Sequence, residues 1–187
     1  LGVVEAGLEK DPHGRVKVDA QWQTTVPGIY AIGDVIEGPM LAHKAEQEAV
    51  AAVECMAGLP GSVNCNTIPA VIYTEPEVAA VGLTEEEANE RGIEVAVGVF
   101  PFQANGRAVA GGHSEGMAKI ISGNKTDRVM GAQILSVNAS ELIAEAVLLM
   151  ELGGSAEDLA RTIHAHPTMS EGLREAAHVA IGEPLHI

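Results

Sequence analysis

The sequence predicts an α+β fold with two regions, residues 1–66 and residues 67–187. In the first region, a short apolar run leads into a loop and then into a helical pattern. In the second, short apolar runs alternate with turn residues, which is typical of antiparallel strands. A long helical pattern follows these runs, so we expect a mixed, mainly antiparallel sheet with helices packed on it.

The composition is that of a folded protein with an acidic surface. Hydrophobic residues make up 47% of the 187 residues and aromatic residues only 3%, which predicts a core of aliphatic side chains. The net charge of −15 argues against binding to nucleic acid or to an anionic membrane, because both need a basic face. Apolar runs fall short of the roughly 20 residues of a membrane helix. The chain opens on LGVVEAGLEKD without a signal peptide, and we expect it to be part of a longer protein.

In the first region we expect strands at 15–19 and 28–34 and a helix at 40–58. Helical spacing places five apolar side chains of this helix on one face: Leu41, Ala45, Ala49, Ala52 and Met56. Gly58 is a natural C-cap, and LPGSVNCN at 59–66 reads as a linker or domain boundary.

The second region carries stronger secondary-structure signals. We expect strands at 68–74, 77–83, 93–100, 117–122 and 128–135, and helices at 84–91, 138–154 and 155–161. Thr84 with Glu87, and Asn138 with Glu141, have the spacing of a capping box at a helix start.

Asp34 lies at the end of an expected strand, and a helix begins near Met40. Ligands of α/β proteins bind at the carboxyl ends of strands, and a helix N-terminus presents unpaired N–H groups. The pair would suit a cofactor with a polyol arm and an electron-rich head. The spacing alone favours an ordinary strand–loop–helix in which Asp34 is a turn residue.

The stretch HAHPTMSE, 164–171, allows three interpretations. His164 and His166 can point the same way and bind a metal, although further ligands are not obvious in the sequence. They can be structural, with Ser170 as N-cap and Glu171 complementing the helix dipole. Finally, Glu171 can fix the tautomer of one imidazole, whose other nitrogen then acts as base and acid.

The sequence offers no plausible nucleophile near this stretch, so the acid–base interpretation needs a partner chain or a missing segment to supply the reacting group. Cys55 and Cys65 match neither a zinc nor a CxxC spacing and are expected to be ordinary thiols.

Taken together, VPGIYAIGDVIEGPMLAHKAEQEAV at 26–50, IPAVIYTEPEVAAVGLTEEEA at 68–88 and HAHPTMSE resemble the C-terminal portion of the dihydrolipoamide dehydrogenases, a family of flavoprotein disulfide reductases. The resemblance covers essentially the whole chain. HAHPTMSE is its most specific element, although glutathione-type reductases share the HPT core and a following glutamate.

The resemblance implies a role for each matching residue. His166 would shuttle a proton for the dithiol substrate, Glu171 would orient it, and His164 would support the structure. Asp34 would hold the ribityl chain of FAD. A further set would lie along the flavin: Met40, Leu41, Ala42 and His43.

The resemblance also implies that residues 1–66 end a FAD-binding α/β domain and that 67–187 form an interface domain. That domain would make a homodimer in which each His166 works on the other subunit's redox centre. The parent would use NAD and serve a 2-oxo acid dehydrogenase complex, in the cytoplasm or, in a eukaryote, in the mitochondrial matrix.

The sequence departs from the family by lacking a GxGxxG segment, a Cys-x4-Cys pair and a nicotinamide domain, so we expect the chain alone to be inactive. Two alternatives remain: part of another, glutathione reductase-like enzyme, or a non-catalytic dimerisation module.

Overall fold

The computed structural model describes residues 2–187, which form two compact units. One unit ends at Cys65, and the other runs Asn66–Ile187. A short 3-10 helix, η2 (Cys65–Thr67), spans this boundary, and both cysteines are free thiols. Within residues 2–187, every helix is too short or too polar to cross a membrane.

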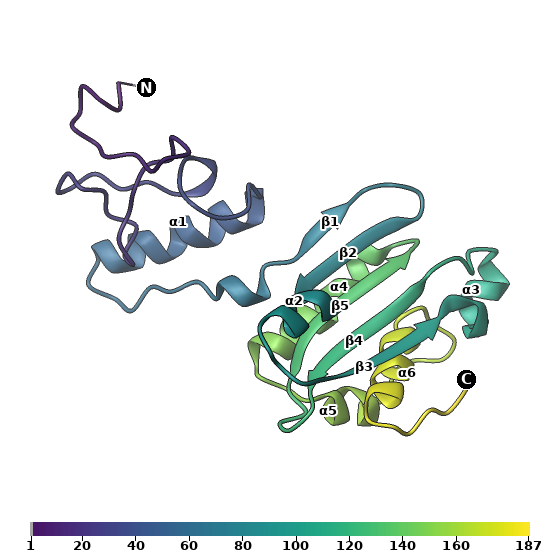
Figure 1. The fold of residues 1–187 in the computed structure, drawn as a ribbon. Helices are drawn as coiled ribbons and strands as arrows, with labels where there is room; N and C mark the ends of the chain where they lie inside the picture. The colour runs from purple at the N-terminus through teal and green to yellow at the C-terminus, as the bar shows by residue number, and fades with distance from the viewer. Residues whose placement is uncertain (1) are drawn as a thin grey trace. The chain divides into compact units, whose positions relative to one another are not determined.

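The first unit contains one long helix, α1 (Ala42–Met56), and a 3-10 turn, η1 (Gly33–Val35) (Figure 1). The prediction of strands at 15–19 and 28–34 was wrong. These segments form only isolated bridges, such as Val18 with Thr24 and Gln23 with Tyr30. A strand needs a neighbour along several residues, and the described part of this unit offers each segment only single pairings.

The buried face of α1 also differs from the expected apolar stripe. Ala52 is buried as expected, but Met56 is 50% exposed, and two charged residues, Lys44 and Glu48, are almost fully buried. Their side chains form an ion pair at 2.9 Å, and Glu48 Oε2 accepts a hydrogen bond of 2.8 Å from the backbone N–H of Gly33. A buried charge needs such partners, so this pair fastens η1 to α1.

The second unit is a five-stranded sheet with the order β1-β2-β5-β4-β3, and every described pairing is antiparallel (Figure 1). The strands are β1 (Ala70–Ile72), β2 (Glu77–Gly82), β3 (Val95–Pro101), β4 (Met117–Gly123) and β5 (Val129–Ser136). The helices are α2 (Glu85–Glu90), η3 (Phe102–Ala104), α3 (Gly106–Gly111), α4 (Ala139–Glu151), α5 (Ala156–Arg161) and α6 (Glu171–Ala180). The α+β class predicted from the sequence is therefore confirmed, although η3 and α3 were not foreseen.

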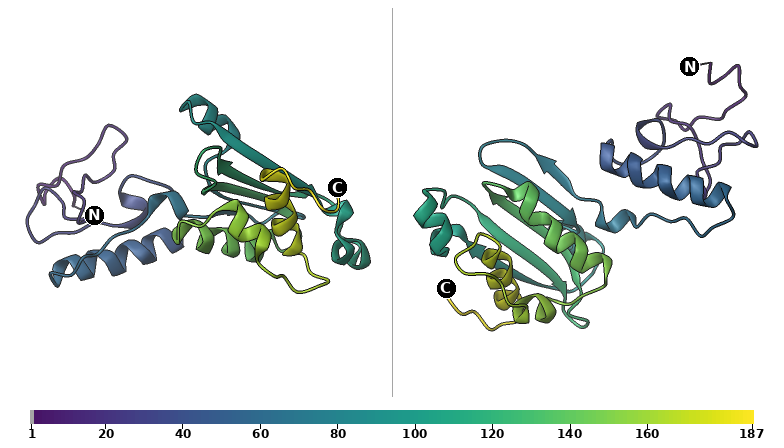
Figure 2. Two further views of the ribbon diagram at one scale, coloured as in Figure 1. Left: turned by 90° about the horizontal axis from the view of Figure 1, so that it is seen from below. Right: turned by 180° about the vertical axis from the view of Figure 1, so that it is seen from behind.

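Two helices, α4 and α6, cover one face of the sheet (Figure 2). α4 packs on β2 and β5, while α6 packs on β3 and β4. The core between these layers is aliphatic as expected, with Ile120, Ile134 and Leu173 at most 1% exposed. The chain's two phenylalanines, Phe100 and Phe102, are also fully buried there.

Contact between α6 and β3 depends on Gly98. A Cβ atom at this position would lie 1.9 Å from the carbonyl oxygen of Ala176 and 2.4 Å from the backbone nitrogen of Ala180. Gly98→Ala is therefore expected to lower the free energy of unfolding by about 1–3 kcal/mol, because backbone atoms must move apart.

Urea denaturation of the chain measures this difference. Gly106→Ala is the matched control, because a Cβ there would meet no atom of residues 2–187 within 4 Å, apart from its chain neighbours and the backbone of its own helix. Equal stability of the two variants would contradict the packing described for α6.

Helix capping follows the sequence pattern at one site and departs from it at another. Thr84 and Glu87 form the expected capping box at α2. Asn138 instead takes a left-handed backbone conformation (φ 60°), and the capping role at α4 passes to Glu77 on β2. Glu77 Oε2 accepts a hydrogen bond of 2.9 Å from the N–H of Ser140.

The hydrogen bonds from Ser140 hold the pKa of the Glu77 carboxyl below its usual range. A group whose pKa is lower in the folded state stabilises the fold above its unfolded pKa of about 4.3, and this stability is lost as the pH falls through the folded pKa. Glu77→Gln is expected to make the unfolding midpoint less pH-dependent between about pH 5 and 3. Glu86→Gln, a change at an exposed glutamate, is the control. Parallel pH profiles for the wild type and Glu77→Gln would contradict the expectation.

Candidate active site

The loop between α5 and α6 carries His166, and Glu171 is the first residue of α6. His166 Nδ1 lies 2.9 Å from Glu171 Oε1, so the imidazole donates its N–H to the carboxylate. The His166 side chain is 79% exposed, whereas that of Glu171 is only 17% exposed. The second ring nitrogen, Nε2, is thus open to a reactant while the carboxylate behind the ring is sheltered.

The Glu171 carboxylate is held in its charged form. Partial burial acts to raise its pKa, but the pKa is lowered overall by the hydrogen bonds from Thr168 and His166 and by the charges of His166 and Arg174. The Thr168 N–H donates to Glu171 Oε2 at 2.8 Å. With one oxygen bound to the backbone, the other is positioned for the imidazole.

Thr168 organises the loop that carries this pair. Its hydroxyl donates to the carbonyl oxygen of Ala165 at 2.7 Å and lies 3.0 Å from the hydroxyl of Ser170. In the structural interpretation of this stretch, Ser170 would cap α6, but its side chain makes no capping hydrogen bond. Its backbone is helical instead (φ −64°), and Glu171 takes the N–H of Thr168.

Sequence reasoning missed Asn105, whose side-chain amide donates to the carbonyl oxygen of Thr168 at 3.0 Å. It lies in a stretch to which we had assigned no element, between β3 and β4. Asparagine is a favoured helix N-cap residue, and the side chain of Asn105 does cap α3. The residues around Asn105 do not indicate that its side chain also binds Thr168, which is 63 residues away in the sequence.

His164 and His166 have different hydrogen-bond partners. His164 Nε2 lies 2.6 Å from Glu145 Oε1 on α4, its Nδ1 lies 2.9 Å from the carbonyl oxygen of Thr162, and its side chain is 5% exposed. Both ring nitrogens are used within the fold. Among residues 2–187, no group of three His, Cys, Asp or Glu side chains is placed to hold a metal ion.

The second set of candidate residues lies in the first unit. Asp34 is exposed on η1, next to the Gly33 N–H that Glu48 holds. α1 begins after Leu41, whose side chain cannot cap the helix, so its first N–H groups depend on other acceptors. Met40 is 76% exposed, Leu41 is half-buried, and Ala42 and His43 are exposed. The arrangement fits a ligand with hydroxyl groups beside Asp34 and an electron-rich ring at the helix N-terminus.

Comparison with known families gives two matches along the chain. Residues 68–177 match the model described as the dimerisation domain of pyridine nucleotide-disulphide oxidoreductases, and residues 1–49 match the model of the pyridine nucleotide-disulphide oxidoreductases themselves. The chain belongs to this family. The first match alone covers more than half of the 187 residues.

Curated relatives of the chain include mitochondrial dihydrolipoyl dehydrogenases. The enzyme of Pisum sativum is 51% identical over 187 residues, and that of Homo sapiens is 54% identical over 176. These alignments cover 100% and 94% of this chain but only 37% and 35% of the relatives. The chain therefore spans little more than a third of their length.

Solved structures of similar proteins include LpdA from Mycobacterium tuberculosis, with a TM-score of 0.89 and 28% identity over 96% of this chain and 39% of that one. The HOCl-induced flavoprotein disulfide reductase RclA from Escherichia coli has a TM-score of 0.86 and 30% identity, over 96% of this chain and 42% of that one.

Proposed function

We propose that this chain is the C-terminal part of a dihydrolipoyl dehydrogenase, an enzyme that oxidises a dihydrolipoamide dithiol to the disulfide and reduces NAD. The observation that carries the proposal is the exposed imidazole of His166 held at 2.9 Å by a carboxylate of lowered pKa. Identity of 51–54% to dihydrolipoyl dehydrogenases along the chain supports the choice of substrate.

His166 is the acid–base residue in this proposal. Oxidation of a dithiol releases two protons and two electrons, and the thiolate is the reactive form of a thiol. His166 Nε2 accepts a thiol proton, and Glu171 stabilises the imidazolium that forms. The thiolate can then attack one sulfur of a disulfide: a mixed S–S bond forms, the original S–S bond breaks, and the released thiolate takes the proton from the imidazolium or from water. The second thiol of the substrate, deprotonated in turn, attacks the mixed disulfide. This attack closes the substrate disulfide, releases the second sulfur of the disulfide centre as a thiolate, and leaves the electron pair on the reduced centre.

Residues 1–66 would contribute one wall of a FAD site. FAD, when bound, relays the electron pair from a reduced disulfide centre to NAD. Asp34 would accept hydrogen bonds from ribityl hydroxyl groups. The residues that would lie along the flavin are Met40, Leu41, Ala42 and His43, at the positive end of α1.

The disulfide that His166 serves would come from a partner subunit. The dimerisation-domain match supports a homodimer formed by residues 67–187. A twofold dimer would present each exposed imidazole to the other subunit. A dimeric mass in solution at micromolar concentration is expected by light scattering, and a monomeric mass would count against this part of the proposal.

The parent enzyme would serve a 2-oxo acid dehydrogenase complex. Since the named relatives are mitochondrial, we place it in the mitochondrial matrix if the source is a eukaryote, and in the cytoplasm otherwise.

A chimera tests the function. The corresponding C-terminal segment of the Pisum sativum enzyme, to which all 187 residues align, is replaced by this chain. We expect NAD reduction that depends on dihydrolipoamide. Turnover of glutathione disulfide instead would favour the glutathione reductase-like alternative. A folded, flavin-containing chimera with no turnover of either substrate would favour the non-catalytic dimerisation module.

A further inference from the structure

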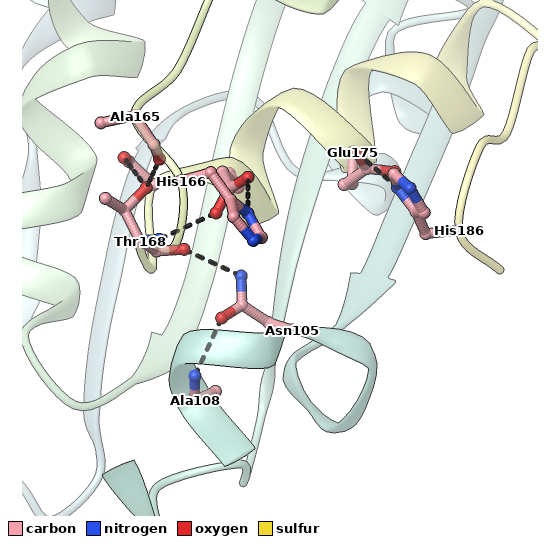
Figure 3. A network of polar contacts seen from close by, with 9 residues as sticks. Asn105, Ala108, Ala165, His166, Thr168, Glu175 and His186 are labelled. Carbon is pink, nitrogen blue, oxygen red and sulfur yellow. Dashed lines mark hydrogen bonds and ion pairs between the residues drawn. The ribbon is translucent and has the colours of Figure 1, made fainter. Parts of the chain in front are cut away.

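Asn105 links two segments that are 63 residues apart in the sequence. It lies between η3 and α3, and it is only 4% exposed. Its Oδ1 accepts a hydrogen bond of 2.9 Å from the Ala108 N–H, and its Nδ2 donates to the carbonyl oxygen of Thr168 at 3.0 Å (Figure 3). One buried amide thus forms hydrogen bonds both to the first turn of α3 and to the loop that carries His166.

The bond to Thr168 acts on the peptide groups beside Glu171. Thr168 donates its N–H to Glu171 Oε2, and its carbonyl oxygen receives the amide of Asn105. The same residue is therefore held from both sides, by the carboxylate and by the amide. Without the side-chain amide of Asn105, the Thr168 carbonyl oxygen loses this hydrogen bond. The Thr168 N–H, which binds Glu171, is then no longer held in one direction.

A second contact ties the same two segments together. Phe102 of η3 is 0% exposed, and a Cβ added at Gly172 would lie 2.7 Å from its Cε1 atom. The first turn of α6 therefore lies directly against η3. The segment from η3 to α3 contacts the chain on both sides of Glu171, at Thr168 through Asn105 and at Gly172 through Phe102.

We propose that Asn105 is a positioning residue for the His166–Glu171 pair, and that its bond to Thr168 sets the geometry in which Glu171 receives His166 Nδ1–H. This inference rests on the proposed acid–base function. Asn105 acts through Thr168 and Glu171 and touches no reacting atom.

The tautomer of His166 reports this geometry directly. A free neutral imidazole is a mixture of Nδ1–H and Nε2–H forms, whereas a carboxylate at Nδ1 selects the Nδ1–H form and leaves Nε2 as the base. The ¹⁵N shifts of the two ring nitrogens, measured at about pH 8, above the usual imidazole pKa of about 6.5, give the ratio of the two forms.

Two substitutions remove the amide donor and keep the helix cap. In Asn105→Ser, the hydroxyl can still accept from the Ala108 N–H but is too short to reach Thr168. In Asn105→Asp, the carboxylate keeps the size of the side chain and presents an oxygen to the Thr168 carbonyl. Asn89→Ser, on the exposed surface of α2, is the matched control.

In the unsubstituted chain and in Asn89→Ser, His166 is expected to be mainly the Nδ1–H form. Both Asn105 variants are expected to shift the tautomer ratio about fivefold toward Nε2–H, the effect of losing one ordinary hydrogen bond on an equilibrium. An unchanged ratio in both folded variants overturns the role of Asn105 while leaving the acid–base function intact.

Two other results are also decisive. A mixture of tautomers already present in the unsubstituted chain overturns the acid–base pair and the positioning role together, because there is no pair to position. Loss of amide dispersion in both Asn105 variants means that Asn105 maintains the fold as a whole, which also overturns the proposal.

Discussion

Replacing His166 by glutamine is expected to lower kcat of the complete chimeric enzyme by about 10²–10⁴-fold, the usual contribution of a general acid–base residue. Glutamine has no group that titrates near neutral pH, so it cannot take the thiol proton. Because the side chain is 79% exposed and packs on little else, the fold is expected to remain intact. The measurement is steady-state NAD reduction with dihydrolipoamide.

His113→Gln is the control, since His113 is also exposed but lies at the end of α3. Its turnover should match that of the wild type. If His166→Gln kept more than about a tenth of the wild-type kcat, the imidazole would not be the principal proton shuttle. The non-catalytic alternative would then gain support.

The second large effect is expected for Glu171→Gln, which should lower kcat about 10²-fold. The glutamine amide has nearly the same size, but it carries no charge to stabilise the imidazolium. It can also donate to His166 Nδ1 and so select the wrong tautomer. Glu115→Gln, at an exposed position before β4, supplies a control for loss of one negative charge.

The two residues are expected to act as one unit. The double variant His166→Gln/Glu171→Gln should therefore lose no more activity than His166→Gln alone. Losses that multiply would mean that Glu171 contributes independently of the imidazole, for instance by holding the loop through Thr168.

Patterns confined to a few neighbouring residues predicted much of this structure. Alternating apolar residues located the strands of the second unit, and the Thr84–Glu87 spacing located the start of α2. His166 and Glu171 are five residues apart, and a contact between Glu171 and one imidazole was among the three interpretations that HAHPTMSE allowed. The structure has this contact at His166. The family resemblance rests on the same local motifs, and the family match agrees with it.

Tertiary structure decided the features that depend on distant residues. The segments 15–19 and 28–34 have the composition of strands, but a strand forms only beside a neighbour that supplies a ladder. Asn138 has the spacing of a cap, but Glu77 of another strand reaches the helix instead.

The candidate site divides in the same way. The contact between His166 and Glu171 is local in the sequence, whereas the carbonyl oxygen of Thr168 is bound by Asn105, which lies 63 residues earlier. The partner of His164, Glu145, comes from a different helix. A hydrogen bond between remote residues depends on how the sheet and the helices pack. The periodicity of the sequence indicates helices and strands but not how they pack on one another. The sequence by itself therefore identified the candidate residues His166 and Glu171, and the fold determined which distant residues contact them and their loop.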